Sequence, residues 1–198
     1  MSGMRGPFAA MIGLSEALLK VEKAAVAGFM MLLTGLILLN VATRYTGMPL
    51  YWVDEAAIYA VVWLTFLGAS AMTRLRLDFC VTLLTERLSP GLAQAAQVTA
   101  TLLLVVFGLA LATMCWVWMD PVGIAAAGFD ARAFAGQSFN FLYTEQTQTL
   151  RWPTWVVSLV LPLFSVSMII HGLANLAEDL KLVPAPTRVG LASAEGVS

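Results

Sequence analysis

Few side chains in this sequence have chemistry that could serve catalysis or cofactor binding. The only histidine is His171, and the two cysteines are Cys80 and Cys115. One histidine cannot supply the pair of axial ligands that a membrane haem commonly uses. The cysteines fall in separate predicted elements near opposite membrane faces, so a disulfide is out of reach and both thiols are interpreted as inert. We therefore predict no catalytic residue, no substrate or metal site and no cofactor, and a hydrogen-bonded role for His171.

A second group of ionisable residues, Arg44, Asp54 and Glu55, flanks a short turn that contains Pro49. Ionisable side chains at membrane depth are costly, which makes them candidates for function. At a membrane boundary, two carboxylates also favour the positive N-terminus of a following helix. Our first interpretation of the group is an anchor and helix cap, and a salt bridge between Arg44 and Glu55 is a second hypothesis.

The elements that must position these residues are membrane helices. Of the 198 residues, 60% are hydrophobic and 12% are charged, whereas about a quarter of a soluble domain is charged. A chain this short has too much surface to hide that apolar excess from water. The apolar stretches long enough to span a bilayer as helices are residues 24–44, 52–73, 90–118 and 152–176. These stretches predict an all-α integral membrane protein with four transmembrane helices, and the net charge of −1 argues against a nucleic-acid partner.

The distribution of basic residues predicts the orientation, because Lys and Arg are retained on the cytoplasmic side. The residues on one side of the four spans are Arg5, Lys20, Lys23, Arg74, Arg76, Arg87, Lys181 and Arg188. Those on the other side are Arg44, Arg132 and Arg151. We therefore expect both termini to lie in the cytoplasm.

The segments at the cytoplasmic face have amphipathic patterns. Residues 1–23 form an N-terminal segment, and its part from 14 to 23 is either an interfacial helix or the overhang of the first span. Between the second and third spans, apolar residues alternate with Arg74, Arg76 and Asp78. That pattern favours an amphipathic segment lying flat at the interface. Residues 184–198 are small and polar, and we expect a disordered tail there.

The predicted periplasmic loop, residues 120–151, is long for a helical hairpin, and long loops usually have structure or function of their own. Its aromatic residues are Phe129, Phe134, Phe139, Phe141 and Tyr143. We favour a small helix that packs on its own bundle, and the alternative is contact with the membrane interface or a partner protein. In the last span, Pro162 predicts a kink. No similarly broken helix matches it in the other half, so the paired broken helices of a transporter's midplane site are missing.

Two spans have distinct faces at helical spacing. One side of the second span presents Trp52, Glu55, Tyr59, Val62, Phe66 and Ala69, and the opposite side presents Ala57, Ala60, Gly68 and Ala71. The small side allows another helix to approach closely, and the aromatic side suits a second protein or lipid. The third span has a stripe of Gln94, Gln97, Thr101, Gly108, Ala112 and Cys115. We expect this stripe to face protein, with its amides hydrogen-bonded.

The residues from Arg44 to Glu55 and from Trp63 to Ala69 also resemble a known family. An Arg-Tyr pair, a Pro, a Trp-x-x-Glu and a Trp-x-x-Phe-x-Gly-Ala follow one another, as in the small membrane subunit of the tripartite ATP-independent periplasmic (TRAP) transporters. The resemblance implies that Arg44, Trp52, Glu55, Trp63 and Gly68 are subunit-interface or anchoring positions. The aromatic side of the second span adds Tyr59 and Phe66 to this set. The sequence departs from the family by carrying Asp78 where a His is frequent, and by its longer outer loop.

The resemblance implies a scaffold subunit in the bacterial inner membrane, without a substrate site of its own. A large multi-helix membrane subunit would hold the substrate and sodium sites, and a periplasmic binding protein would capture the solute, commonly an organic acid. Two alternatives remain: the membrane anchor of a redox enzyme, and a stand-alone small transporter. A haem absorbance band would favour the anchor, and solute flux through this chain alone would favour the transporter.

Overall fold

The computed structural model describes residues 6–77 and 88–183, and in these residues the protein is helical, with no strand. The helices are α1 (Pro7–Tyr45), α2 (Tyr51–Leu75), α4 (Pro90–Met119), α5 (Pro121–Ala126), α6 (Ala131–Ser138), α7 (Thr154–Ser158) and α8 (Val160–Asp179). Four helical stretches in the described part are long and apolar enough to cross a membrane: Phe8–Tyr45, Tyr51–Leu75, Pro90–Ala126 and Thr154–Asp179. The predicted all-α class with four spans is confirmed. The expected tail, 184–198, lies outside the described residues.

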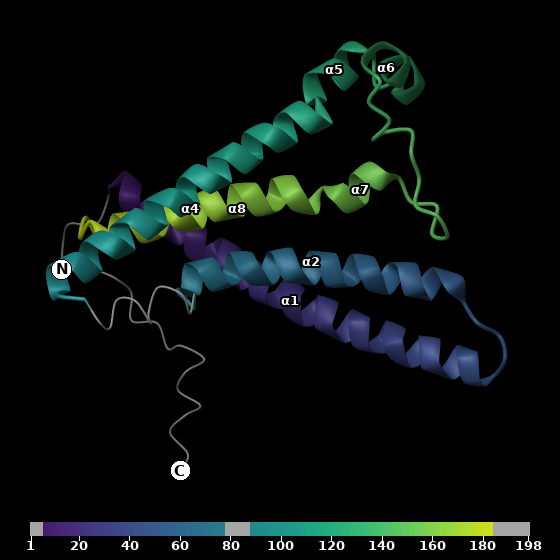
Figure 1. Cartoon of the computed structure of the whole chain (residues 1–198), viewed down its shortest axis with the longest axis horizontal. Coiled ribbons are helices and arrows are strands. Elements are labelled where there is room, and N and C mark those ends of the chain that lie inside the picture. Colours follow the sequence, from purple (N-terminus) through teal and green to yellow (C-terminus); the bar gives the residue numbers. More distant parts are fainter. Residues whose placement is uncertain (1–5, 78–87, 184–198) are drawn as a thin grey trace.

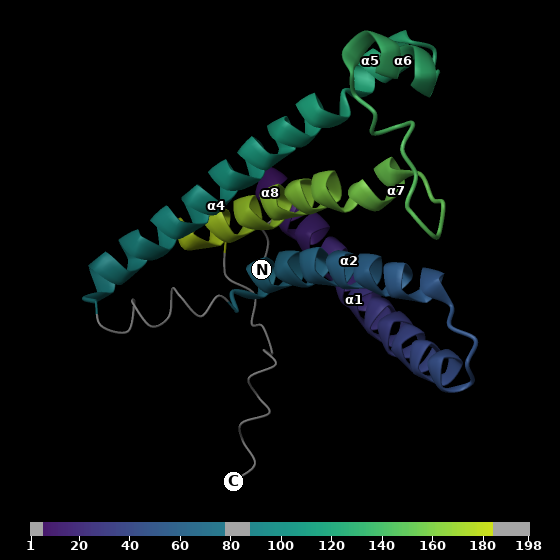
Figure 2. The same ribbon diagram turned by 45° about the vertical axis from the view of Figure 1, so that its right-hand side comes forward.

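The four long helices form an open arrangement (Figures 1 and 2). α1 and α2 pack together as an antiparallel hairpin, and α8 contacts α1, α2 and α4. Within the described residues, α4 packs on α8 and makes no comparable contact with α1 or α2. At one end of the molecule α2 and α8 finish and α4 begins, and we call this the terminal end. At the other end α1 and α4 finish, and we call this the loop end. Both views show α4 diverging from the α1–α2 hairpin toward the loop end.

From Pro7 onward, the N-terminal segment is part of α1. This helix has 39 residues and is therefore about 58 Å long at 1.5 Å per residue, about twice the thickness of the hydrocarbon core. Its continuity fits the interpretation of residues 14–23 as an overhang of the first span. Ser15 and Glu22 on this overhang are buried against the other long helices. The overhang is thus a packed part of the helix bundle.

The last span is broken where the sequence predicts a kink. α7 ends at Ser158 and α8 begins at Val160. Pro162 has no N–H to donate to the carbonyl of Ser158, and its ring crowds that carbonyl. The break therefore follows from one proline, two residues inside α8.

The polar stripe of α4 faces α8, as predicted. The Gln97 amide and the Thr101 hydroxyl donate to the Asp179 carboxylate over 2.9 and 2.8 Å, and Gln94 donates to the Asp179 carbonyl over 2.6 Å. Cys115 is buried and forms no disulfide. Close approach of the two helices depends on glycines, because a Cβ added at Gly172 would lie 2.7 Å from Val105 Cγ2. α4 and α8 are thus joined by polar contacts at the terminal end and by close packing along their length.

Candidate functional site

The charged group at the loop end is organised around the turn between α1 and α2. Arg44 Nη2 lies 2.8 Å from Asp54 Oδ2, and Arg44 Nε donates to Asn40 Oδ1 over 2.8 Å. The Asn40 amide also donates to Asp54. The predicted salt bridge between Arg44 and Glu55 is therefore wrong. Successive residues of a helix point about 100° apart, so Asp54 faces α1 and Glu55 faces elsewhere.

Glu55 instead holds the loop that leads into α7. Its carboxylate accepts backbone N–H groups from Gln148, Thr149 and Leu150 at 2.8, 2.7 and 2.9 Å. The Thr149 hydroxyl donates to the same carboxylate, and the Tyr59 hydroxyl donates to it over 3.3 Å. A side chain of α2 thereby fixes a segment more than 90 residues further along the chain. We call residues 147–152 the clamped segment.

We predict that Glu55→Gln loosens the clamped segment. An amide has one acceptor oxygen where the carboxylate has two, and it lacks the charge that strengthens these hydrogen bonds. The amides of Gln148, Thr149 and Leu150 should exchange with deuterium faster in the variant, as measured by exchange mass spectrometry in detergent. Glu145→Gln is the matched control, because Glu145 holds the loop through its backbone carbonyl. Unchanged exchange in the Glu55 variant would contradict the clamp.

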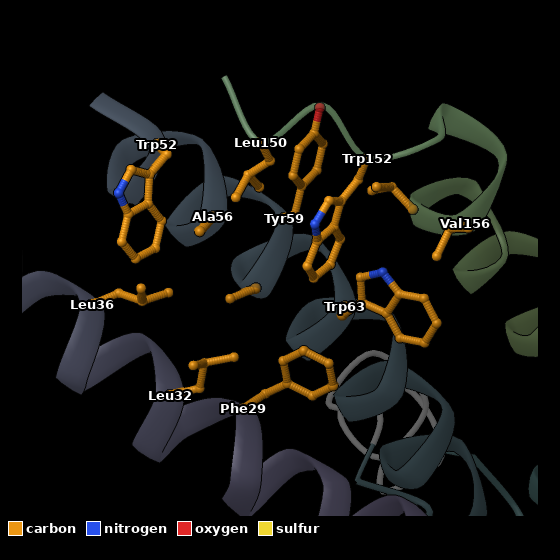
Figure 3. A pocket seen from close by; sticks show the side chains of 12 residues that line it. Phe29, Leu32, Leu36, Trp52, Ala56, Tyr59, Trp63, Leu150, Trp152 and Val156 are labelled. Carbon is orange, nitrogen blue, oxygen red and sulfur yellow. The ribbon is translucent and has the colours of Figure 1, made fainter. Parts of the chain in front are cut away.

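The clamped segment closes one side of an apolar groove with a volume of about 480 Å³. Its walls are Phe29, Leu32 and Leu36 of α1, Trp52, Ala56, Tyr59, Ala60 and Trp63 of α2, and Leu150, Trp152, Val156 and Val157. Figure 3 shows the three tryptophans and Tyr59 turned toward the same space. The rings of Phe29 and Trp63 stack with centroids 5.9 Å apart. Glu55 therefore positions one wall of the groove through Leu150 and Trp152.

Several of the residues predicted from the sequence meet at this groove. Trp52, Tyr59 and Trp63 line it, and Glu55 braces it from the loop side. Arg44 lies apart, in the turn cluster with Asp54. Phe66 packs edge-on against Phe164 of α8, with ring centroids 5.0 Å apart.

Gly68 belongs to the side of α2 that carries small residues, and it has open space beside it. Ala60 and Ala71 are buried, as helix packing requires. A Cβ added at Gly68 would meet nothing within 4 Å. Its neighbours Thr65 and Ala69 are exposed. The exposed face of α2 therefore has a small-residue surface that no other described helix of this chain covers.

At the terminal end, Arg74 lies in the last turn of α2 and is completely buried. The sequence interpretation placed it in a separate interfacial segment, but the helix continues to Leu75. Its guanidinium lies 2.7 Å from the Glu16 carboxylate and 2.9 Å from that of Glu178. It also donates to the Asn175 amide oxygen over 2.6 Å. Arg74 thus links α1, α2 and α8.

Arg76 follows as the left-handed C-cap of α2. Its Nη1 lies 2.8 Å from Asp179 Oδ1, the carboxylate that also accepts from Gln97 and Thr101 of α4. Arg74, Arg76, Asn175, Glu178 and Asp179 therefore form a polar network that reaches all four long helices. Asp78 and Cys80 lie outside the described residues.

His171 is buried two turns before Glu178. One ring nitrogen lies 2.7 Å from Ser15 Oγ, and the other lies 3.0 Å from Glu22 Oε2. The second oxygen of Glu22 accepts the Ser70 hydroxyl over 2.7 Å. Both ring nitrogens are thus used in holding α1 to α8, which fits the hydrogen-bonded role predicted for His171.

Sequence reasoning missed the acidic partners on α1, Glu16 and Glu22. A signal was present, because Ser15 and Glu22 are seven residues apart and therefore on one helix face. His171, Asn175 and Glu178 share one face of α8 by the same rule. Within residues 6–77 and 88–183, no three or more His, Cys, Asp and Glu side chains are grouped to hold a metal ion.

Comparison with known proteins places these features in a family. Neither the curated proteins nor the solved structures give a match. Residues 33–182 match the family described as "Tripartite ATP-independent periplasmic transporters, DctQ component". The match includes α2, the clamped segment, the groove walls on α2 and α7, and the whole polar network. Because it covers more than half of the sequence, the chain belongs to the DctQ family, the small membrane component of the TRAP transporters.

Proposed function

We propose that this chain is the static membrane subunit of a sodium-coupled, binding-protein-dependent transporter of organic-acid solutes. In this proposal a large membrane subunit moves the solute, a periplasmic protein delivers it, and this chain supplies a fixed frame in the bacterial inner membrane. The family match supports the assignment to a tripartite system. The observation that carries the scaffold role is that the buried charges pair with one another across helices.

The pairing supports a frame because each contact ties separate helices together. Arg74 connects α2 to α1 and α8, and the His171–Glu22 pair connects α8 to α1. Asp179 connects α8 to α4 through Gln97 and Thr101. Breaking such buried pairs is costly, so helices joined in this way resist moving relative to one another.

The proposed partner surface is the exposed face of α2 together with the apolar groove. Ile58 is 63% exposed and Val61 is 44% exposed, on the same side as the open Gly68. Helices in a membrane associate through small residues that let backbones approach. We place the termini in the cytoplasm and the loop end in the periplasm, because the sequence places most basic residues on the side of the spans that holds the termini.

We predict that Gly68→Leu weakens assembly with the large subunit and leaves this chain folded. Filling a close helix contact costs about 1–3 kcal/mol, which corresponds to a roughly 5- to 150-fold loss of association constant. The measurement is the amount of large subunit that co-purifies with the tagged variant. Gly35→Leu on α1 is the control, since its added Cβ also meets nothing within 4 Å. Equal recovery of the large subunit with both variants would remove the α2 face from the interface.

Solute flux in liposomes tests the proposed function directly. Liposomes that contain this chain alone should take up no organic acid when a sodium gradient is applied. Liposomes that contain both membrane subunits, with the binding protein supplied outside, should take it up. Sodium-driven uptake by the chain alone would contradict the scaffold role.

A further inference from the structure

The segment at the end of α4 is a folded unit, which we call the loop hairpin and define as residues 120–143. The Asp120 side chain caps α5 by accepting from Gly123 N over 2.8 Å, and the Asp130 side chain caps α6 in the same way. Phe134 is buried against Tyr143, whose hydroxyl donates to the Met119 carbonyl over 2.7 Å. Burial raises the pKa of Tyr143, and the nearby Asp120 carboxylate adds to the effect. The loop hairpin is therefore fixed to the end of α4.

Two phenylalanines of this fixed unit are exposed. Phe129 is 77% exposed and Phe139 is 81% exposed, while Phe134 is 3% exposed. Phe129 has a φ of 61° and Phe139 a φ of 56°, in the left-handed region where a helix commonly ends on glycine. A bulky side chain is disfavoured there. The two phenylalanines are thus held in unfavourable backbone positions while their side chains stay largely exposed.

The length of α4 is sufficient to bring the loop hairpin to a membrane surface. α4 has 30 residues, so it is about 45 Å long, and a bilayer with its headgroups is about 40–45 Å thick. Trp116 is 62% exposed and Trp118 is 42% exposed just before α4 ends, and exposed tryptophans gather where membrane meets water. Both views show α5 and α6 of the loop hairpin at the end of α4 (Figures 1 and 2).

The surface around Phe129 suits a phospholipid layer. Phe129 borders a second groove of about 470 Å³, which Pro121 and Ile124 of α5 and Trp155 and Leu159 also line, so Phe129 lies beside further apolar side chains. Arg132 is exposed on α6, three residues beyond Phe129. A guanidinium matches the geometry of a phosphate group. Apolar side chains with a nearby cation are the arrangement expected of a segment that lies in the headgroup region.

We propose that the loop hairpin is a membrane-surface anchor that inserts Phe129 and Phe139 into the headgroup region of the bilayer, with Arg132 at the lipid phosphates. In this proposal the exposed Trp116 and Trp118 at the end of α4 lie in the same headgroup region. The anchor fixes the end of α4, which packs on α8 and has little contact with the other long helices. This role does not depend on the large subunit.

Nitroxide labels can report where the two phenylalanines lie. Phe129→Cys and Phe139→Cys would be labelled separately in a variant with Cys80→Ala and Cys115→Ala. The full chain would be reconstituted in vesicles of phosphatidylethanolamine and phosphatidylglycerol at a ratio of 3:1. Collisions of each label with oxygen, which partitions into lipid, and with a water-soluble nickel chelate give a ratio that measures immersion. Gln137→Cys is the control, because Gln137 is an exposed polar residue of the same α6.

The anchor predicts a severalfold higher ratio of oxygen to nickel collisions at Phe129 and Phe139 than at Gln137. The two phenylalanines are exposed, so cysteine at either position removes little packing, and circular dichroism checks the fold. Equal ratios at all three positions would overturn the proposal. Labels that are open to nickel in the chain alone, and become shielded only after the large subunit is added, would assign the surface to a protein partner and overturn it as well.

Discussion

Replacing Arg74 with Met is expected to lower the free energy of unfolding by about 3–5 kcal/mol, as when one partner of a buried ion pair is removed. The Arg74 guanidinium is completely buried and lies within 3 Å of the Glu16 and Glu178 carboxylates. Met has a similar length, so the loss measures charge and hydrogen bonding more than volume. Without Arg74, the Glu178 carboxylate stays buried with less compensation. The measurement is unfolding in mixed micelles, followed by circular dichroism.

Arg44→Met is the matched control for Arg74→Met. The Arg44 side chain is 58% exposed in its pair with Asp54, and exposed ion pairs contribute about 0–1 kcal/mol. The two substitutions are chemically identical and differ in burial. A loss at Arg74 no larger than that at Arg44 would mean that the polar network does not hold the helices together.

Gly172→Leu is expected to separate α4 from α8, with a loss of about 1–3 kcal/mol or more. A Cβ at Gly172 would lie 2.7 Å from Val105 Cγ2 and 2.9 Å from Leu104 Cδ2, both on α4. The remaining atoms of leucine would enter space that α4 already occupies. Because α4 packs chiefly on α8, few other contacts hold α4 in place against this clash. Thermal unfolding in detergent measures the loss.

The control for Gly172→Leu is Gly35→Leu, where an added Cβ meets nothing within 4 Å. Leucine also has the higher helix propensity, so Gly35→Leu should be neutral or slightly stabilising. A distance between spin labels on α4 and α8 shows whether the helices have moved apart. Unchanged stability and distance in the Gly172 variant would contradict the close packing of these two helices.

The fold was largely predictable because its main signals are local. An uncharged apolar stretch specifies a spanning helix whatever its neighbours are, and Pro162 breaks the helix that contains it. The stripe from Gln94 to Cys115 was identified because polar and small residues repeat at helical spacing. Such a stripe in a membrane must face protein, and it faces α8.

The contacts of the site were less predictable because they join distant parts of the chain. Glu55 accepts N–H groups from a loop about 95 residues away, and backbone donors leave no mark in a sequence. Arg44 was the partner expected for Glu55, but it pairs with the neighbouring Asp54. A difference of one residue along a helix rotates the side chain by about 100°. Arg74 was assigned to an interfacial segment because it begins the alternation of charged and apolar residues that follows the second span. The helix includes it because Glu16 and Glu178 compensate the charge.

The two ends of the molecule are braced in different ways. The polar network joins all four long helices at the terminal end, and at the loop end Glu55 ties α2 to the segment before α7. Between these ends, the apolar groove and the exposed face of α2 remain uncovered by the described residues. In the proposed scaffold, a large subunit occupies that uncovered surface.

Purification of the tagged chain from its native membrane in mild detergent tests this account most directly. Native mass spectrometry should find the chain bound to one much larger multi-helix membrane protein at a fixed stoichiometry. The complex should persist in several mild detergents, because the proposed contact is apolar and closely packed. Recovery of the chain without a large membrane partner in all of these detergents would contradict the scaffold role.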